Sequence, residues 1–360
     1  MIAKGQAVVS GHGWLLYGAN GYTGRLIAAE AVRRGLRPVL AGRREEAIRP
    51  LAESLELDCR VFPVNGAPFD RLVHELEPFS AVLLAAGPFA ATSGPVVDAC
   101  IQAGTHYLDI TGEIEVFEAL YRRGKRAEEQ GCALLPGVGF DVVPSDCLAA
   151  TLSEWLPGAR SLELGLAPSI TPTSGTAATM VEGLPQGGAV REAGHIRRSP
   201  SGAHYRTVPF RDRERTAVSI PWGDVSTAYH STGIPDIVVY AAVPRLVVPA
   251  MRLSRPVLPL LGLPPVQRLL TAGARRLRGP DAAAREAGRS HLWGKVTGDG
   301  GVARAATLEV PEAYRLTSHT AVESVWRVVA GDAQPGFRTP SGVFGAAYIT
   351  EFPGCNLSPV

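Results

Sequence analysis

The stretch WLLYGANGYTGRLIAAEAVRRG, residues Trp14 to Gly35, places three glycines at three-residue spacing between an apolar run and a helical pattern. Gly18 allows a tight turn, Gly21 lets the backbone approach a pyrophosphate, and Gly24 lets the helix sit close on the strand. The helix N-terminus offers unpaired N–H groups and a partial positive charge, which attract phosphate. The pattern therefore predicts a dinucleotide site. The residues expected to hold the cofactor here are Gly18, Asn20, Gly21, Tyr22, Thr23 and Gly24.

The N-terminal part of the chain alternates apolar runs with helical patterns. The six runs are WLLYG, RPVLAGR, CRVFPVN, AVLLAAG, HYLDITG and CALLPGVG. Continuous apolar runs separated by helices indicate parallel strands that are buried on both faces. We therefore predict an α/β fold, with a Rossmann-type doubly wound parallel sheet over residues 1–150 as the dinucleotide-binding domain.

The pattern changes after about Ala150. ARSLELGLAP, RTAVSIPW and DIVVYAAVP are typical of strands, and GRSHLWGKVTGDGGVARAATLEV predicts two strands around a GDGG turn. Residues 151–315 are expected to form a second α+β domain with a mixed or antiparallel sheet, for substrate binding and dimerisation. Residues 316–360 are expected to form a C-terminal helix and a tail that returns to the Rossmann domain.

The end of the second apolar run distinguishes between the two nicotinamide dinucleotides. An NAD site usually carries an acid about 20 residues past the glycines, which binds the ribose 2′-hydroxyl. Here RPVLAGRR ends in Arg43 and Arg44 instead. A guanidinium binds a 2′-phosphate in bidentate fashion, whereas a carboxylate would repel it. We predict NADP(H), with Arg43 as the main contact. The nearby Glu45 and Glu46 leave open that the two arginines are a surface pair.

The composition argues against several other classes of protein. Hydrophobic residues make up 46% of the 360 residues, and the formal net charge of +2 is too close to neutral to indicate nucleic-acid binding. Five cysteines without a CxxC pair predict reduced thiols in a cytoplasmic protein rather than disulfides. The sequence contains no HExxH helix pair and no GxSxG elbow, so we predict neither a metal site nor a hydrolase.

The most apolar segment runs from Ile237 to Leu270. Arg245, Arg252, Arg255 and several prolines interrupt it, so that no uncharged run reaches the ~20 residues of a membrane-spanning helix. We expect no transmembrane segment. The segment is interpreted as buried helices or a dimer face, and an apolar substrate channel or a weak membrane-surface contact stays open.

Several of these motifs resemble the saccharopine dehydrogenase-like NADP-binding family, in particular its branch of trans-acting enoyl reductases. They are GANGYTGRLIA, VLAGRR, AAGPFA, VVDACIQAGTHYLDITGE and PGVGFDVVPSD, with LWGKVTGDGG and FRTPSGVFGAAYITEFPG later in the chain. The resemblance covers the first domain well and the middle of the chain poorly. It implies a homodimer that uses NADPH to reduce a C=C, C=N or C=O bond. It also implies that Gly87, Pro88 and Phe89 lie along the nicotinamide half of the cofactor.

The segments YLDITGE and GFDVVPSD follow the fifth and sixth apolar runs, at the strand ends where ligands of parallel α/β sheets bind. The resemblance implies that both segments line the reaction cleft. The cofactor supplies the hydride, and the protein supplies orientation and often a proton. Candidate proton donors are Tyr107, Asp109, Glu113 and Asp141, and for Asp109 the alternative is a residue that caps or braces the turn.

The expected activity is the reduction of a biosynthetic intermediate. The apolar segment from Ile237 to Leu270 favours an apolar or carrier-tethered substrate. One alternative is reductive amination of the saccharopine or opine type, for which the arginines of HIRRSP and FRDRER would bind the carboxylates of the substrate. The other is an NADP-bound scaffold protein without turnover.

Overall fold

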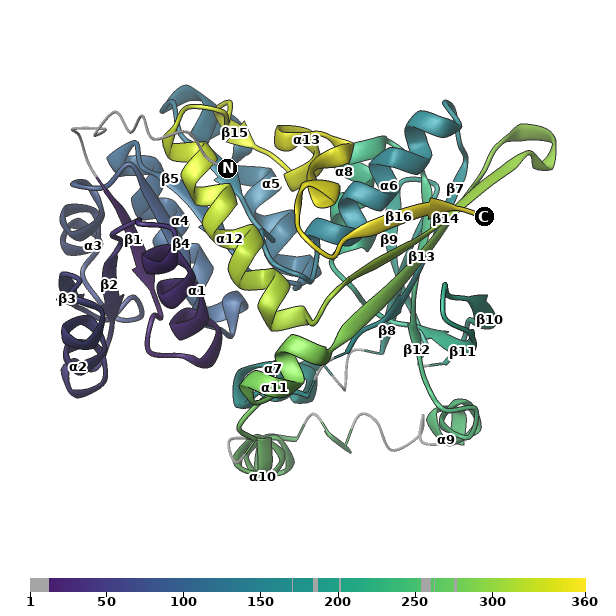
Figure 1. The fold of residues 1–360 in the computed structure, drawn as a ribbon, viewed down its shortest axis with the longest axis horizontal. Coiled ribbons are helices and arrows are strands. Elements are labelled where there is room, and N and C mark those ends of the chain that lie inside the picture. The colour runs from purple at the N-terminus through teal and green to yellow at the C-terminus, as the bar shows by residue number, and fades with distance from the viewer. Residues whose placement is uncertain are drawn as a thin grey trace.

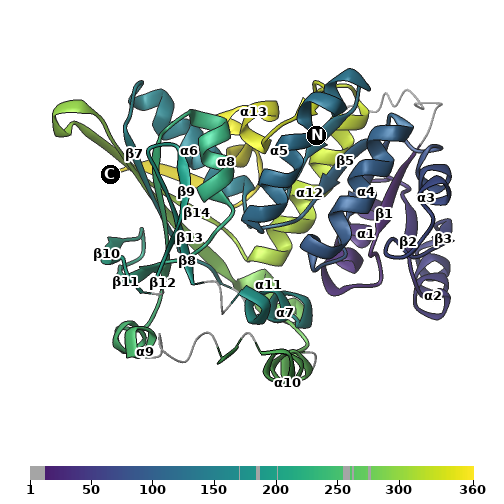
Figure 2. The ribbon, with the colours of Figure 1, turned by 180° about the vertical axis from the view of Figure 1, so that it is seen from behind.

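Two sheets, each with its own helices, make up the molecule (Figure 1). The computed structural model describes residues 13–169, 171–183, 187–200, 202–253, 260–261, 263–274 and 277–360. The first sheet and its helices lie in one half of the molecule, and the second sheet lies in the other half, as the reverse view also shows (Figure 2).

The elements of the first half follow each other as alternating strands and helices. Their bounds are β1 Trp14–Tyr17, α1 Tyr22–Arg33, β2 Val39–Gly42, α2 Glu45–Leu55, β3 Cys59–Val61, α3 Phe69–Leu76, β4 Ala81–Leu84, α4 Phe89–Ala103, β5 His106–Asp109, α5 Ile114–Glu129, β6 Ala133–Leu135 and α6 Val143–Trp155.

The second half begins with β7 and returns to the first at the end of the chain. The bounds are β7 Ser161–Ala167, α7 Ser174–Gly183, β8 Gly188–Glu192, β9 His195–Ser199, β10 Tyr205–Pro209, β11 Glu214–Ser219, α8 Asp224–Thr232, β12 Asp236–Ala242, α9 Val247–Leu253, α10 Pro264–Ala274, α11 Ala282–Ala287, β13 Arg289–Thr297, η3 Asp299–Gly301, β14 Ala303–Pro311, α12 Ala313–Val329, β15 Gly336–Phe337, α13 Pro340–Phe344, η4 Ala346–Glu351 and β16 Asn356–Pro359.

The first sheet is parallel and covered by helices on both faces. Its strands in the described residues run in the order β15-β6-β5-β4-β1-β2-β3. Side chains alternate along β1, so that Leu15 and Tyr17 cluster with α3, α4 and α5, while Trp14 and Leu16 cluster with α1, α2 and α12. Burial on both faces explains why the strands read as continuous apolar runs. The predicted doubly wound Rossmann-type sheet is confirmed.

The second sheet is mixed, as predicted. Its main order is β10-β11-β12-β7-β13-β14-β16, and β8 joins β12 with β9 at its side. β12 and β7 are parallel, whereas the other pairs are antiparallel. Helices α6 and α8 pack on one face, where Leu148 and Val225 join Leu164 and Leu292 of the strands in one core.

The C-terminal part divides between the two sheets. α12 lies beside α1, to which it is joined by an ion pair of 2.6 Å between Arg34 and Glu323. β15 then adds to β6 in the first sheet, and β16 pairs with β14 in the second. The sequence predicts six strands for the first sheet and misses β15, because two residues are too few to show a pattern. The boundaries drawn after residues 150 and 315 stay predictions.

A polar cluster around Glu118 of α5 joins the first half to the second. Glu118 accepts hydrogen bonds from Arg191 of β8 (3.1 Å) and Ser226 of α8 (2.6 Å), and lies 3.4 Å from Nε2 of His230. Burial acts to raise the pKa of Glu118, but the contacts with His230 and Ser226 and the charge of Arg191 outweigh it and lower the pKa to about 2. The carboxylate is therefore stabilised in its charged form in the folded protein.

A side chain at Gly24 has no room in this fold. A Cβ there would lie 2.3 Å from the carbonyl oxygen of Gly18, which is backbone and cannot rotate away. We expect Gly24→Ala to lower the free energy of unfolding, measured by urea denaturation, by about 1–3 kcal/mol. The matched control is Gly94→Ala in α4, where a Cβ meets nothing within 4 Å. It should leave stability unchanged or raise it by up to about 1 kcal/mol. Wild-type stability of Gly24→Ala would contradict the close packing.

We expect the contribution of Glu118 to the free energy of unfolding to depend on pH. The pKa of Glu118 is lower in the folded protein than its usual value of 4.5, so its contribution is present above about pH 4.5 and is lost as the pH falls towards 2. We expect Glu118→Gln to be less stable than wild type by about 2–3 kcal/mol at pH 7, with a gap that narrows below pH 4.5. Urea denaturation between pH 7 and pH 3 measures it. The control is Glu129→Gln, which changes an exposed acid on the same helix. If the difference in free energy of unfolding between wild type and Glu118→Gln did not depend on pH, the lowered pKa of Glu118 would be refuted.

Candidate functional site

The carboxyl ends of β1, β4, β5 and β6 lie along one edge of the first sheet, because neighbouring strands are parallel. The segments that follow them are 18–21, 85–88, 110–113 and 136–142, and we call these the strand-end loops. They carry the predicted glycine turn, Gly87 and Pro88 of the GPF motif, and the candidate proton donors Glu113 and Asp141, while Tyr107 lies within β5. Ligands of open α/β sheets bind at this edge.

The glycine turn is held tightly between β2 and β4. Gly18 has φ +87° and donates its N–H to the carbonyl of Ala41 at 2.8 Å. A Cβ at Gly18 would lie 2.8 Å from the backbone of Ala85. Helix α1 begins after Gly21, without a side-chain cap and without an acid in its first turn. Small residues and an uncapped helix N-terminus fit a diphosphate, whose charge would complement the free N–H groups.

Tyr22 faces the second half of the molecule. Its hydroxyl donates to the Pro280 carbonyl at 2.5 Å and accepts from Arg285 at 2.8 Å. Its ring packs edge-on against Tyr314, with centroids 5.0 Å apart. Burial raises the pKa of Tyr22, so its hydroxyl keeps its proton. Tyr22 was predicted to bind cofactor, and its contacts make it a link between the turn and the second half. Asn20 and Thr23, also predicted, are partly buried within the turn.

Arg43 and Arg44 follow β2 and are exposed. Among the described residues Arg43 forms no ion pair, whereas Arg44 lies 4.0 Å from Glu46. Glu45 is held by Arg49 of the same helix at 2.5 Å. Of the two acids that left open a surface arginine pair, Glu46 thus lies against Arg44 and Glu45 against Arg49, and neither pairs with Arg43. Arg43 remains available for a phosphate.

Glu113 closes the N-terminus of α4. Its two carboxylate oxygens accept from the backbone N–H groups of Phe89 (2.9 Å) and Ala90 (2.7 Å). The GPF loop is braced further by Thr92, whose hydroxyl donates to the Ala86 carbonyl at 2.7 Å. An anionic side chain thus occupies the N-terminus of α4, whereas the N-terminus of α1 has no side-chain cap. Glu113 therefore holds the loop of Gly87, Pro88 and Phe89 in place. Because both of its carboxylate oxygens are engaged, Glu113 is less suited to donate a proton.

Tyr107 and Asp109 form a buried pair at the end of β5. Both are 0% exposed, and the Tyr107 hydroxyl donates to Asp109 at 2.7 Å. Asp109 also accepts from the N–H groups of Thr111 (3.0 Å) and Gly137 (2.9 Å). It thereby ties two strand-end loops together, in the bracing position expected of it. Burial raises the pKa of Asp109 to about 6 and holds the pKa of Tyr107 well above its usual range.

Asp141 is the remaining candidate donor, and its carboxyl is partly exposed. Asp141 accepts no hydrogen bond from the described residues. It lies so close to Gly112 that a Cβ added at Gly112 would come within 3.1 Å of the Cβ of Asp141. Burial and then the charge of Glu113 raise its pKa to about 6. A carboxyl with such a pKa is protonated in part near neutral pH, which is the property that a general acid requires.

A loop of the second half, Pro221 to Asp224, packs onto the strand-end loops. A Cβ at Gly223 would lie 2.7 Å from the Phe117 ring and 3.3 Å from the Gly112 carbonyl. The indole N–H of Trp222 and one carboxyl oxygen of Asp224 are buried without a partner in the described residues. The sequence pattern RTAVSIPW predicts a strand as far as Trp222 and therefore does not predict this loop. The Pro-Trp-Gly-Asp turn, just before a helix, was the available signal.

Asp224 is fully buried at the start of α8. Burial raises the pKa of Asp224 well above its usual range. The hydroxyl of Ser145 donates to Asp224 at 2.8 Å and lies 3.1 Å from the Val142 carbonyl. The contact with Ser145 acts to lower the pKa of Asp224, but burial outweighs it.

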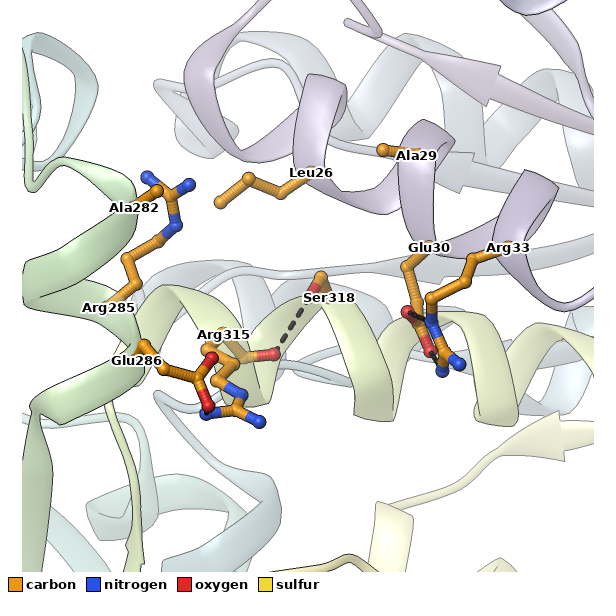
Figure 3. Close-up of a pocket in the computed structure, with 9 residues that line it drawn as sticks. All are labelled: Leu26, Ala29, Glu30, Arg33, Ala282, Arg285, Glu286, Arg315 and Ser318. Carbon is orange, nitrogen blue, oxygen red and sulfur yellow. Dashed lines mark hydrogen bonds and ion pairs between the residues drawn. The ribbon is translucent and has the colours of Figure 1, made fainter.

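A pocket of about 280 Å³ lies beside the glycine turn, between α1, α11 and α12 (Figure 3). Its arginines are already paired, Arg33 with Glu30 at 2.6 Å and Arg315 with Glu286 at 2.8 Å. Arg285 is used by Tyr22. The pocket is smaller than the roughly 300–1,000 Å³ of ordinary ligand sites. Because its arginines are already engaged, the pocket also lacks a free cation for a phosphate. We therefore do not assign this pocket to the cofactor.

The described residues contain no cluster of three or more His, Cys, Asp or Glu that would hold a metal ion. In the same part of the chain, no helix has the length and apolar character needed to cross a membrane.

Comparisons with known proteins agree with this geometry. Residues 14–135 match the family model of the saccharopine dehydrogenase NADP binding domain. Over 141 residues the chain is 35% identical to a trans-acting enoyl reductase of Mycobacterium tuberculosis, a match that covers 37% of this chain and 33% of that protein. It is 29% identical over 153 residues to a saccharopine dehydrogenase-like oxidoreductase of Bos taurus, covering 37% and 35%. The chain thus matches about a third of the length of each relative.

A solved structure extends the similarity of fold to nearly the whole chain. The apo saccharopine dehydrogenase (L-Glu forming) of Saccharomyces cerevisiae superposes with a TM-score of 0.67. The alignment covers 97% of this chain and 100% of that chain at 12% sequence identity. The likeness therefore concerns the fold of both halves.

Arg43 is predicted to distinguish NADPH from NADH. A charged hydrogen bond contributes about 1.5–3 kcal/mol, so Arg43→Ala should raise the Kd for NADPH about 10- to 100-fold. The Kd for NADH, which lacks the 2′-phosphate, should change little. Titration of both cofactors, followed by protein fluorescence, measures the two constants. Arg49→Ala, which removes an exposed arginine paired with Glu45, is the control. An unchanged affinity for NADPH would remove Arg43 from the site.

Proposed function

We propose, because residues 14–135 match the family model of the saccharopine dehydrogenase NADP binding domain, that the chain is an NADPH-dependent reductase. The observation that carries the proposal is the glycine-lined, uncapped N-terminus of α1 inside this domain. The backbone of 18–24 would hold the diphosphate, and Arg43 the ribose phosphate. NADPH, when bound, supplies a hydride. The rigid 85–88 loop, braced by Thr92 and Glu113, would support the nicotinamide end.

Asp141 is the proposed proton donor. Of the acidic groups around the strand ends, Asp109 is fully buried and Glu113 is engaged by two N–H groups. Asp141 is partly exposed, and its pKa of about 6 leaves a fraction protonated near neutral pH. Tyr107 acts as a positioning residue through Asp109, since its hydroxyl is buried and already donated.

The proposed substrate is an apolar or carrier-tethered biosynthetic intermediate whose C=C, C=N or C=O bond accepts the hydride. The relatives named trans-acting enoyl reductase and the apolar segment after Asp236 support this class. Reductive amination of a compact amino acid would need free arginines for the carboxylates. In FRDRER, Arg213 and Arg215 both lie against Asp212, at 4.0 Å and 2.5 Å. Arg197 and Arg198 of HIRRSP are exposed and form no ion pair with the described residues, so reductive amination stays the alternative.

The role of Asp141 predicts a pH dependence. The acid must be protonated to donate, so kcat/KM of the wild type should fall as the pH rises through about 6. Asp141→Asn should lower the rate about 10²- to 10⁴-fold, remove this limb of the profile and leave the Kd for NADPH unchanged. Stopped-flow loss of NADPH absorbance, with enoyl thioesters, imines and ketones as acceptors, measures it.

The matched control is Asp332→Asn, an exposed acid that should leave rate and profile as in wild type. A full rate and an unaltered pH profile for Asp141→Asn would reject Asp141 as the donor. Tight NADPH binding by the wild type, without oxidation by any of the three acceptor classes, would instead favour the non-catalytic scaffold.

A further inference from the structure

The basic charge of the chain is concentrated in one segment. Of its 36 lysines and arginines, seven lie between Ile237 and Pro280, all of them arginine, and this stretch has no Asp or Glu. The other 29 face 34 acids in the rest of the chain. A slightly negative protein thus carries a strongly positive, leucine-rich segment. This asymmetry suits a partner that is both apolar and anionic.

The segment beyond β12 forms the outer margin of the second half. In both views α9 and α10 lie at the lower edge of the molecule, and both are seen nearly end-on (Figure 1 and Figure 2). One plane can therefore touch both helices along their length. The large apolar side chains exposed in this region are Leu246, Leu253, Leu260, Leu263, Leu269 and Leu277, of which Leu246 and Leu253 are more than 80% exposed.

The inward sides of the two helices are already anchored. In α9, Val248 is buried and Arg252 donates to the Gly202 carbonyl at 3.1 Å. In α10, Gln267 donates to the carbonyls of Val181 (3.1 Å) and Leu261 (2.7 Å). The prediction of buried helices is therefore wrong for these leucines, because other residues fill the inward positions. The leucines project into solvent.

Cations stand among the exposed leucines. Arg245, Arg268 and Arg278 are exposed, and none forms an ion pair with the described residues. A pocket of about 440 Å³ lies between α9 and the β10–β11 hairpin. Arg245 and Arg252 line it together with the hydroxyl-bearing Thr207 and Thr216. Two guanidinium groups and two hydroxyls are suited to a phosphate group.

We propose that α9 and α10 dock the protein on the surface of an anionic phospholipid bilayer. The leucines would enter the interfacial region, and the arginines would pair with lipid phosphates, one of them at the pocket beside α9. Exposed leucines spread over two separate helices and the residues near them suit a fluid surface, which closes around each side chain. The arginine-only charge selects an anionic surface. Membrane docking is a function separate from the proposed reduction. It would bring the protein to the phase in which apolar substrates dissolve.

Vesicle flotation with the full chain tests the proposal. We expect binding to vesicles of phosphatidylcholine with phosphatidylglycerol, at least tenfold weaker binding to phosphatidylcholine alone, and weakening as salt rises. Leu246→Ser with Leu253→Ser and Leu269→Ser should lower binding at least tenfold. Arg245→Gln with Arg268→Gln should lower binding and reduce its salt dependence. The controls Val302→Ser and Trp326→Ser remove exposed apolar side chains elsewhere and should bind as wild type.

Three results would overturn the docking surface. They are absence of binding to the anionic vesicles at low salt, equal loss in the controls, and leucine-dependent self-association in sedimentation velocity without vesicle binding. The last would identify the face as an interface between copies of the chain. NADPH binding by each variant verifies its fold. Because flotation requires no turnover, its outcome is independent of whether the protein is a reductase.

Discussion

The contact of Gly24 with the Gly18 carbonyl is the constraint on which the rest of the structure depends. With only hydrogen at Gly24, α1 starts directly against the turn, and its first N–H groups face the strand ends without a cap. The same start sets Tyr22 against Pro280, Arg285 and Tyr314. The turn that is suited to a diphosphate is therefore also a joint between the two halves.

The acids at the strand ends divide their tasks by environment. Asp109 is enclosed by three donors and ties two loops together, whereas Glu113 is fixed at a helix N-terminus that favours its charge. Burial raises the pKa of the less engaged Asp141, and the charge of Glu113 raises it further. Glu113 thus braces the GPF loop and also adds to the rise in the pKa of the candidate donor.

The sequence was sufficient where local pattern decides structure. Glycine spacing and continuous apolar runs predicted six parallel strands, the turn at Gly18 and the bracing role of Asp109. Contacts between residues that are distant in the sequence could not be predicted from it. The partner of Tyr22 lies 258 residues away, and the acid at Glu113 could not be distinguished from a donor until Phe89 and Ala90 were seen to engage it. The leucines of α9 and α10 read as core, because apolar composition alone does not tell an inward face from an outward one.

The segment after α10 connects the proposed docking surface to the nucleotide turn. Gly279 lies so close to Thr173 and Tyr22 that a Cβ there would come within 2.7 Å and 3.0 Å of them. The backbone N–H of Thr173 in turn donates to the Tyr314 hydroxyl at 2.9 Å. A protein resting on α9 and α10 would therefore hold its second half against the membrane, and the contacts of Gly279 with Thr173 and Tyr22 would join that half to the glycine turn.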